Sequence, residues 1–92
     1  MKRFLIERDI PKAGEMKISE LRDAARRSNE VLAELGPTIQ WVESYVAADK
    51  LFCVYLAEDE ALIHRHAETS GFPANRVTEI RRTIDPTTAA LH

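Results

Sequence analysis

The chain has 92 residues, 45% hydrophobic and 30% charged, and its 13 basic and 15 acidic side chains leave a formal net charge of −2. This length corresponds to one domain with a small core, so burial of further surface in a homodimer is favoured. The balanced charge, without a basic tract, argues against a nucleic-acid partner, and no apolar run is long enough to cross a membrane.

The cysteine and glycine content narrows the class further. Cys53 is the only cysteine, so no disulfide can form within the chain, and a reduced, cytoplasmic location is expected. Residues 1–7 contain too short an apolar core for a secretory signal peptide. The three glycines lie far apart, so there is no glycine-rich phosphate loop and no nucleotide cofactor is expected.

The first third of the chain predicts a strand followed by a helix. Residues 3–9 place Phe4 and Ile6 on one side and Leu5 and Glu7 on the other, and they end before Pro11, which has no amide proton for a sheet. Ser19 is a suitable N-cap for a helix. The apolar stripe that follows, at spacings of three and four residues, extends this helix to Leu35, and Gly36 ends it.

The middle of the chain predicts a β-hairpin. Residues 38–47 and 51–57 each alternate in the manner of a strand and are rich in aromatic and β-branched side chains. The connection between them, residues 48–50, is short and polar. The two strands are therefore expected to pair antiparallel.

The last third predicts a second helix and a final strand. Asp59 caps a helix that runs to about Ser70, and residues 76–84 form the strand. The order βαββαβ predicts an α+β, ferredoxin-like fold, in which a four-stranded antiparallel sheet carries two helices on one face. Residues 1–86 form this domain, and residues 87–92 form a flexible C-terminal tail.

The alternation along the strands also predicts the two faces of the sheet. The side chains expected to meet the helices are Phe4, Ile6, Val42, Val46, Phe52, Val54, Leu56, Ile80 and Ile84. Those expected on the opposite face are Glu7, Trp41, Glu43, Tyr45, Cys53, Tyr55, Glu79 and Arg81. Aromatic side chains on a face without helices predict homodimerisation through the sheet.

One histidine is placed for chemistry at the end of the second helix. His66 follows Leu62 and Ile63 at helical spacing and therefore shares their buried face. An imidazole there could carry out acid–base catalysis or bind a metal. The alternative is a buried, hydrogen-bonded ring that the helix dipole stabilises.

Residues 52–55, residues 66–73 and the strand that follows resemble a family of small proteins formerly known only as a domain of unknown function, one branch of which binds nickel. The resemblance implies a ferredoxin-like fold that dimerises into an α/β barrel. It also implies nickel or another divalent metal as a possible cofactor, with His66 as a metal ligand. Two places where the nickel-binding branch carries histidines hold Arg8, which is always cationic, and Phe72, which has no donor atom.

Further side chains are candidates for a ligand-binding site, each with a structural alternative. Glu7 and Glu43 could form a carboxylate pair or simply pair with arginines. Cys53 could act as a thiolate or pack as a small apolar residue. Three aromatic residues could line an apolar pocket or a dimer interface: Trp41, Tyr45 and Tyr55. The complete candidate set is His66, Glu7, Trp41, Glu43, Tyr45, Cys53 and Tyr55.

Three classes of function follow from these observations. The first is a dimeric protein that binds a small ligand or a metal. The second is a cofactor-free enzyme of the oxygenase or isomerase type, which would act on a small apolar substrate with His66 and a carboxylate or tyrosine as acid and base. The third is a structural or interaction module. A closed cavity containing His66 would favour the enzyme.

Overall fold

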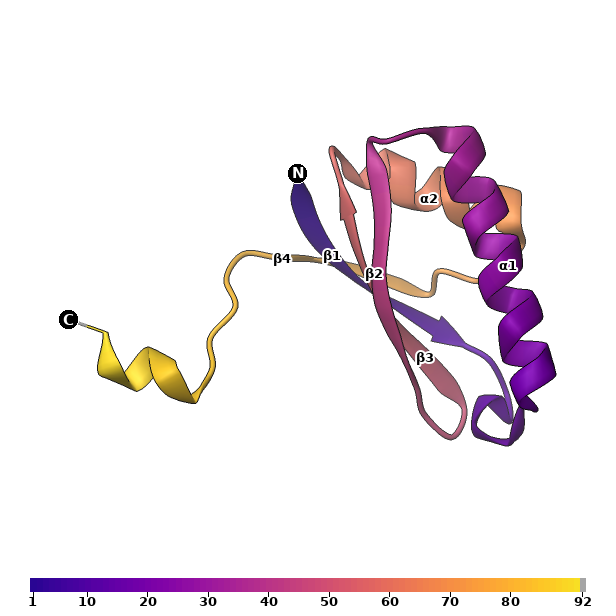
Figure 1. The fold of residues 1–92 in the computed structure, drawn as a ribbon, viewed down its shortest axis with the longest axis horizontal. Helices are drawn as coiled ribbons and strands as arrows, with labels where there is room; N and C mark the ends of the chain where they lie inside the picture. Colours follow the sequence, from indigo (N-terminus) through magenta and orange to yellow (C-terminus); the bar gives the residue numbers. More distant parts are fainter. Residues whose placement is uncertain (92) are drawn as a thin grey trace.

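The structure, a computed structural model, describes residues 1–91, so the last residue of the predicted tail, His92, lies outside the described residues. The order of strands and helices confirms the predicted α+β fold (Figure 1). The elements are β1 (Lys2–Asp9), the 3-10 helix η1 (Ala13–Glu15), α1 (Ile18–Leu35), β2 (Ile39–Val46), β3 (Lys50–Ala57), α2 (Glu60–Ser70), β4 (Arg76–Ile80) and the 3-10 helix η2 (Pro86–Ala90).

The four strands form one antiparallel sheet in the order β2-β3-β1-β4. Both helices pack on the same side of this sheet, and α1 contacts α2 there (Figure 1). We call this side the helix face and the other side the open face. None of the helices within residues 1–91 is both long and apolar enough to cross a bilayer.

The helix ends follow local chemistry. The Asp59 side chain accepts a hydrogen bond from the Leu62 amide at 3.2 Å, as the predicted N-cap of α2 should. The prediction that Ser19 caps α1 was wrong, because the helix begins earlier, with Lys17 at the N-cap position. There the Glu20 carboxylate accepts from the Lys17 amide at 3.0 Å, so an acidic side chain stabilises the first turn.

The final strand is shorter than predicted. β4 ends at Ile80, whereas alternation suggested residues 76–84. Its only neighbour in the sheet is β1, and the last pair between them is Arg3 with Ile80, so the chain has almost no partner strand beyond that point. Residues 81–91 leave the sheet and extend away from the domain, and residues 87–91 of the predicted tail fall within this segment (Figure 1).

The helix face of β3 differs from the prediction. Phe4 and Ile6 of β1 face the helices as predicted, and their partners across the ladder are Tyr55 and Cys53. Directly opposed residues in a ladder share a face, so Tyr55 and Cys53 belong to the core. Both sides of β3 are apolar, which is why its alternation could not choose between them. Three residues predicted to meet the helices therefore lie on the open face: Phe52, Val54 and Leu56.

A β-bulge explains the corresponding error in β2. The register between β2 and β3 shifts between Trp41 and Glu43, so the two pair with Tyr55 and Val54 on opposite faces. Trp41 therefore lies on the helix face, against the prediction, and Val42 is 45% exposed instead of buried.

Alternation was also read in the wrong phase in β4. Glu79 pairs with Phe4 and lies on the helix face, whereas Ile80 pairs with Arg3 and lies on the open face. Arg81 and Ile84, which were also predicted to lie on the open face and the helix face, follow the end of β4 and belong to neither face.

Candidate ligand-binding cavity

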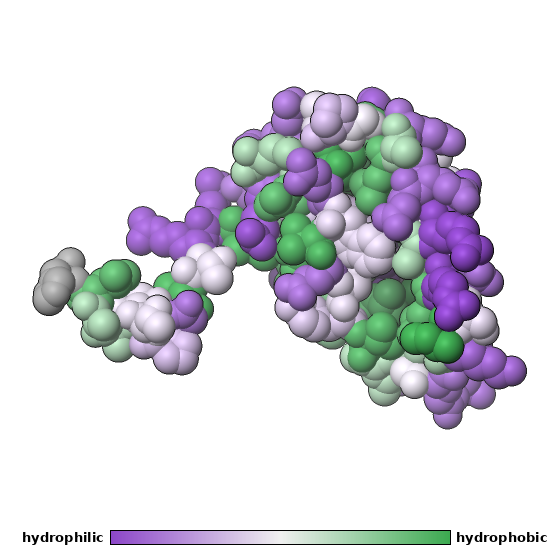
Figure 2. All heavy atoms as spheres, in the orientation of Figure 1, coloured by the Kyte–Doolittle hydropathy of each residue, from purple (hydrophilic) through white to green (hydrophobic). Residues whose placement is uncertain are grey.

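A cavity of about 240 Å³ lies between α1 and the helix face of β2 and β3. In Figure 2, apolar residues occupy the region between the hydrophilic outer side of α1 and the strands. Most of the side chains that α1 turns toward the sheet are small there, which leaves room for the cavity, whereas the strands supply larger side chains. The residues that line the cavity are Arg8, Ile10, Met16, Leu21, Ala24, Ala25, Ser28, Trp41, Ser44, Val46, Leu51, Cys53, Tyr55 and Phe72.

Three of the predicted candidates line this cavity, namely Trp41, Cys53 and Tyr55. Trp41 is fixed by a hydrogen bond from its indole nitrogen to the Ser44 hydroxyl at 2.9 Å. Cys53 is a buried free thiol on the central strand β3. The sheet thus brings together residues that the sequence had assigned to the opposite face.

A buried hydrogen-bonded chain closes the polar end of the cavity. The Ser28 hydroxyl lies 3.2 Å from the Tyr55 hydroxyl and 3.1 Å from Nε2 of His66. A hydroxyl can accept from one neighbour while donating to another, so Ser28 satisfies both groups. Burial raises the pKa of Tyr55, whose phenol therefore stays protonated.

His66 lies behind this chain and does not line the cavity. Its ring is 1% exposed and stands 5.1 Å from the Tyr55 ring, centroid to centroid. Burial, and secondarily the positive charge of Arg8, lowers the pKa of His66 from 6.5 to about 4. At neutral pH the ring is therefore uncharged, and its Nε2 is engaged with Ser28. The alternative of a buried, hydrogen-bonded histidine describes this geometry.

Arg8 is the unexpected member of the site. Its side chain is on the helix face and only 2% exposed. The Nη1 atom donates to the carbonyl oxygen of Pro73 at 2.8 Å, and the guanidinium carbon lies 5.9 Å and 5.7 Å from the ring centroids of Tyr55 and Phe72. Nη2 is buried without a hydrogen-bond partner among residues 1–91, and Arg8 takes part in none of the ion pairs of that part of the chain.

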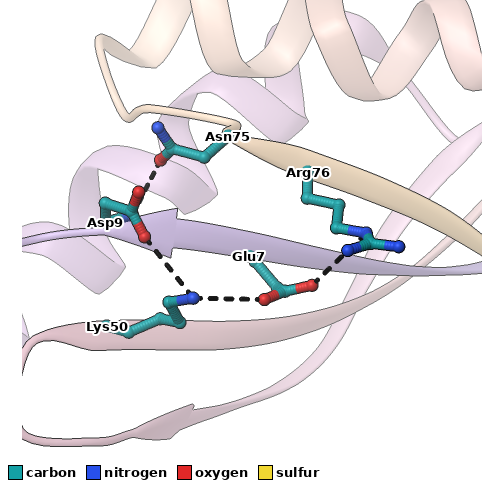
Figure 3. A network of polar contacts seen from close by, with 5 residues as sticks. All are labelled: Glu7, Asp9, Lys50, Asn75 and Arg76. Carbon is teal, nitrogen blue, oxygen red and sulfur yellow. Dashed lines mark hydrogen bonds and ion pairs between the residues drawn. The ribbon is translucent and has the colours of Figure 1, made fainter.

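The remaining candidates lie on the open face and do not join the cavity. Glu7 lies 3.3 Å from Nζ of Lys50 and 3.9 Å from Nε of Arg76, in a network that also includes Asp9 and Asn75 (Figure 3). The candidate carboxylate pair is not formed, because β3 separates the strands of the two glutamates. Glu43 instead accepts a hydrogen bond at 2.9 Å from the exposed phenol of Tyr45.

The residues around His66 do not fit a nickel ion. In the described residues, no three side chains of His, Cys, Asp or Glu lie close enough together to hold a metal. The groups beside His66 are a hydroxyl, a phenol ring and the permanent cation of Arg8, which repels a divalent ion. His64 points away and pairs with Glu60 on the surface at 3.0 Å. The donor set around His66 in the described residues of one chain therefore does not fit a metal centre of the kind that the resemblance implied.

Sequence reasoning missed the roles of Arg8 and Ser28, although a signal for each was present. Arg8 continues the alternation of Phe4 and Ile6, so it had to share their face. Ser28 lies within the apolar stripe of α1, where a polar side chain must be buried with a partner. Polar residues at apolar positions were the signal for the site.

None of the curated proteins matches this sequence. The crystal structure of SCO4226 from Streptomyces coelicolor A3(2) is similar, with a TM-score of 0.75 and 14% sequence identity over 89% of this chain and 99% of that chain. At this identity the likeness confirms the ferredoxin-like fold alone. A family model described as "Nickel responsive protein SCO4226-like" matches residues 4–80, from β1 to the end of β4. The chain therefore belongs to the SCO4226-like family of nickel responsive proteins.

Proposed function

We propose that this chain is a small-ligand-binding protein whose site is the cavity between α1 and the sheet. The observation that carries the proposal is a partly open apolar cavity of about 240 Å³ with one buried cation, Arg8, in its wall. Apolar cavities with a few placed polar groups are the usual form of small-molecule sites. The size suits a ligand of about the bulk of a medium-chain alcohol or acid.

A direct role in nickel binding is less well supported. The family name connects this group of proteins with nickel. Here, Arg8 and Phe72 occupy the places that the resemblance assigns to histidines, and His66 is the remaining imidazole. A neutral ring already bonded to Ser28 beside a guanidinium favours a cavity for organic ligands over a metal site.

Catalysis is also less well supported than binding. A cavity containing His66 would favour an enzyme, but His66 is not among the residues that line this cavity. The pKa of about 4 makes its ring a weak base at neutral pH. No carboxylate lines the cavity to act as an acid or base partner within residues 1–91.

A fluorescence titration tests the proposal, because the single tryptophan lines the cavity. We expect octan-1-ol to change the emission of Trp41 saturably. The variant Ala25→Phe fills the cavity from α1 and should abolish the change, whereas Ala33→Phe on the exposed side of the same helix should not. A signal that persists unchanged in Ala25→Phe, or no signal in the wild type, would contradict the proposal.

We further propose that the open face is the interface of a homodimer. Its apolar side chains have no covering element among residues 1–91, and several are half-buried within the sheet. The charged groups beside them, Glu7, Asp9, Lys50 and Arg76, are two acids and two bases whose charges cancel. A second copy of the same face suits such a surface better than a strongly charged partner does. The apolar residues are Leu5, Phe52, Val54, Leu56 and Ile80.

Sedimentation equilibrium distinguishes a dimer from a monomer. Leu56→Lys places a charge among the apolar residues of the open face and should shift the protein to the monomer. Ala33→Lys places the same charge on the outer side of α1 and should leave the dimer intact. A wild-type monomer at all concentrations would overturn the dimer and leave the cavity proposal standing.

We infer a cytoplasmic location from the cysteine. Cys53 is a buried free thiol that lines the cavity, and no second cysteine is present in the sequence to oxidise with it. Unpaired thiols are typical of reducing compartments.

A further inference from the structure

We propose that the ligand of this cavity is a monocarboxylate with an apolar body, whose carboxylate pairs with the guanidinium of Arg8. The inference rests on the proposed function and adds the chemical class of the ligand. It comes from the juxtaposition of a buried arginine, one of whose nitrogens has no partner, and a cavity that is otherwise apolar.

The state of Arg8 is the first step. A guanidinium stays protonated in any protein environment, so a 2% exposed arginine is a buried positive charge. A buried charge is costly unless an opposite charge and hydrogen bonds compensate it. Here the compensation comes from one carbonyl, that of Pro73, and from the faces of Tyr55 and Phe72. None of these groups is an anion.

The partner that is missing is therefore an acceptor with a negative charge. Nη2 of Arg8 has no acceptor within the described chain. A carboxylate fits a guanidinium fork through charge-assisted hydrogen bonds, which are stronger than bonds to neutral acceptors. Ser28 and Tyr55 line the same cavity, and the Tyr55 hydroxyl can donate to such a group when Nε2 of His66 donates to Ser28 and Ser28 donates to Tyr55.

The charge of the lining limits the ligand to one anionic group. Arg8 is the only cation among the lining residues, and no acidic side chain is among them. A phosphate dianion or a dicarboxylate would bring a second charge with no cation to meet it. A single carboxylate leaves the filled cavity neutral.

The rest of the cavity describes the body of the ligand. Arg8, Ser28 and Tyr55 lie near one another, as their contacts show. Leu21 lines the cavity two turns before Ser28 along α1. The interval from Leu21 to Ser28 is about 10 Å along a helix that rises about 1.5 Å per residue. Apolar side chains occupy it, so an unbranched acyl chain or a single ring with a short stem fits this space.

Isothermal titration calorimetry at pH 7 with octanoate and with octanamide tests the inference. The two probes share the same chain and differ in charge. The wild type should bind octanoate more tightly by about tenfold or more, the value of a charged hydrogen-bonded pair over a neutral one. Arg8→Met should remove this preference, and Arg8→Lys should keep part of it, because lysine retains the charge without the fork. Arg76→Met, on the open face, should leave it unchanged.

The outcomes separate the two proposals. Equal affinity of the wild type for octanoate and octanamide would overturn the carboxylate ligand and leave the cavity as a binding site. Preference for octanoate that persists in Arg8→Met would also overturn it. If neither probe binds the wild type, the proposed function itself fails. Arg8→Lys and the comparison of probes on the wild type keep the test valid should Arg8→Met not fold.

Discussion

Ser28 of α1 and His66 of α2 are joined by a hydrogen bond of 3.1 Å between Oγ and Nε2, which ties the two helices together above Tyr55 of the sheet. All three side chains are buried, so water cannot replace any partner that is lost. The hydrogen-bonded side chains of Tyr55, Ser28 and His66 form the polar wall between the hydrophobic core and the cavity.

Removing the Ser28 hydroxyl should destabilise the protein. Ser28→Ala leaves the Tyr55 hydroxyl and the His66 ring nitrogen buried without their shared partner, which we expect to lower the free energy of unfolding by about 1–3 kcal/mol. Chemical denaturation measures the change. Ser19→Ala, on the exposed first turn of the same helix, is the matched control and should have almost no effect. Equal stability of the two variants would contradict the role of the chain.

The buried state of His66 predicts how stability depends on pH. Its pKa is about 4 in the folded protein against an ordinary value of 6.5, so between these values the unfolded chain binds a proton that the folded protein does not. Stability from this group is complete above pH 6.5 and is lost as the pH falls toward 4, by up to about 3 kcal/mol. His66→Gln cannot titrate and should show a shallower loss in urea denaturation over this range. Parallel pH profiles for the two proteins would refute the assignment.

Arg8 is expected to cost stability in the free protein. Arg8→Met replaces a buried cation with an apolar side chain of similar length, so the free energy of unfolding should stay the same or rise by about 1–4 kcal/mol. Thermal unfolding without added ligand measures this change. A residue that lowers the stability of the free protein is typical of a binding site. A loss of about 2 kcal/mol or more would show instead that Arg8 is compensated in the free protein.

Nickel should not stabilise this member of the family. The groups around His66 offer one neutral imidazole beside the Arg8 cation, so nickel chloride should leave the melting temperature of the wild type unchanged. His64→Ala removes the surface pair with Glu60 and serves as a control for weak binding there. A stabilisation that disappears in His66→Ala and persists in His64→Ala would place a metal at the buried site and contradict this account.

Gly14 is required for the contact between η1 and the β2–β3 hairpin. A Cβ atom at this position would lie 3.0 Å from the backbone oxygen of Ala47 and 3.1 Å from Cα of Ala48. The Gly14 amide also donates to the Ala48 oxygen at 2.9 Å, which holds the two segments together. Gly14→Ala should therefore cost about 1–3 kcal/mol in denaturation experiments. The exposed Ala33→Ser gives the background effect of a small substitution, and a cost no larger than that background would contradict the close approach.

The sequence was sufficient to predict the fold because its local signals agreed. Periodicity, the cap at Asp59 and the glycines at 36 and 71, both with positive φ, all indicated the same order of elements. The faces of the sheet were harder to predict. β3 is apolar on both sides, and one extra residue at Val42 reversed the alternation of β2.

The site was only partly predictable for the same reason. His66, Trp41, Cys53 and Tyr55 were named as candidates, but placing three of them on the open face separated them from their neighbours. Arg8 was recognised only as a residue that cannot bind a metal. Its role depends on the contacts that surround it, with Pro73, Tyr55 and Phe72, and these come from segments far apart in the sequence.

The most direct test of the central claim is a titration of isotope-labelled protein with octanoate, followed by nuclear magnetic resonance. The account predicts shifts concentrated at the lining of the cavity, in the Trp41 indole and the amides of Leu21 and Cys53, with saturation at one ligand per chain. Shifts confined to residues of the open face, such as Val54 and Leu56, or no shifts at all, would contradict a ligand site between α1 and the sheet.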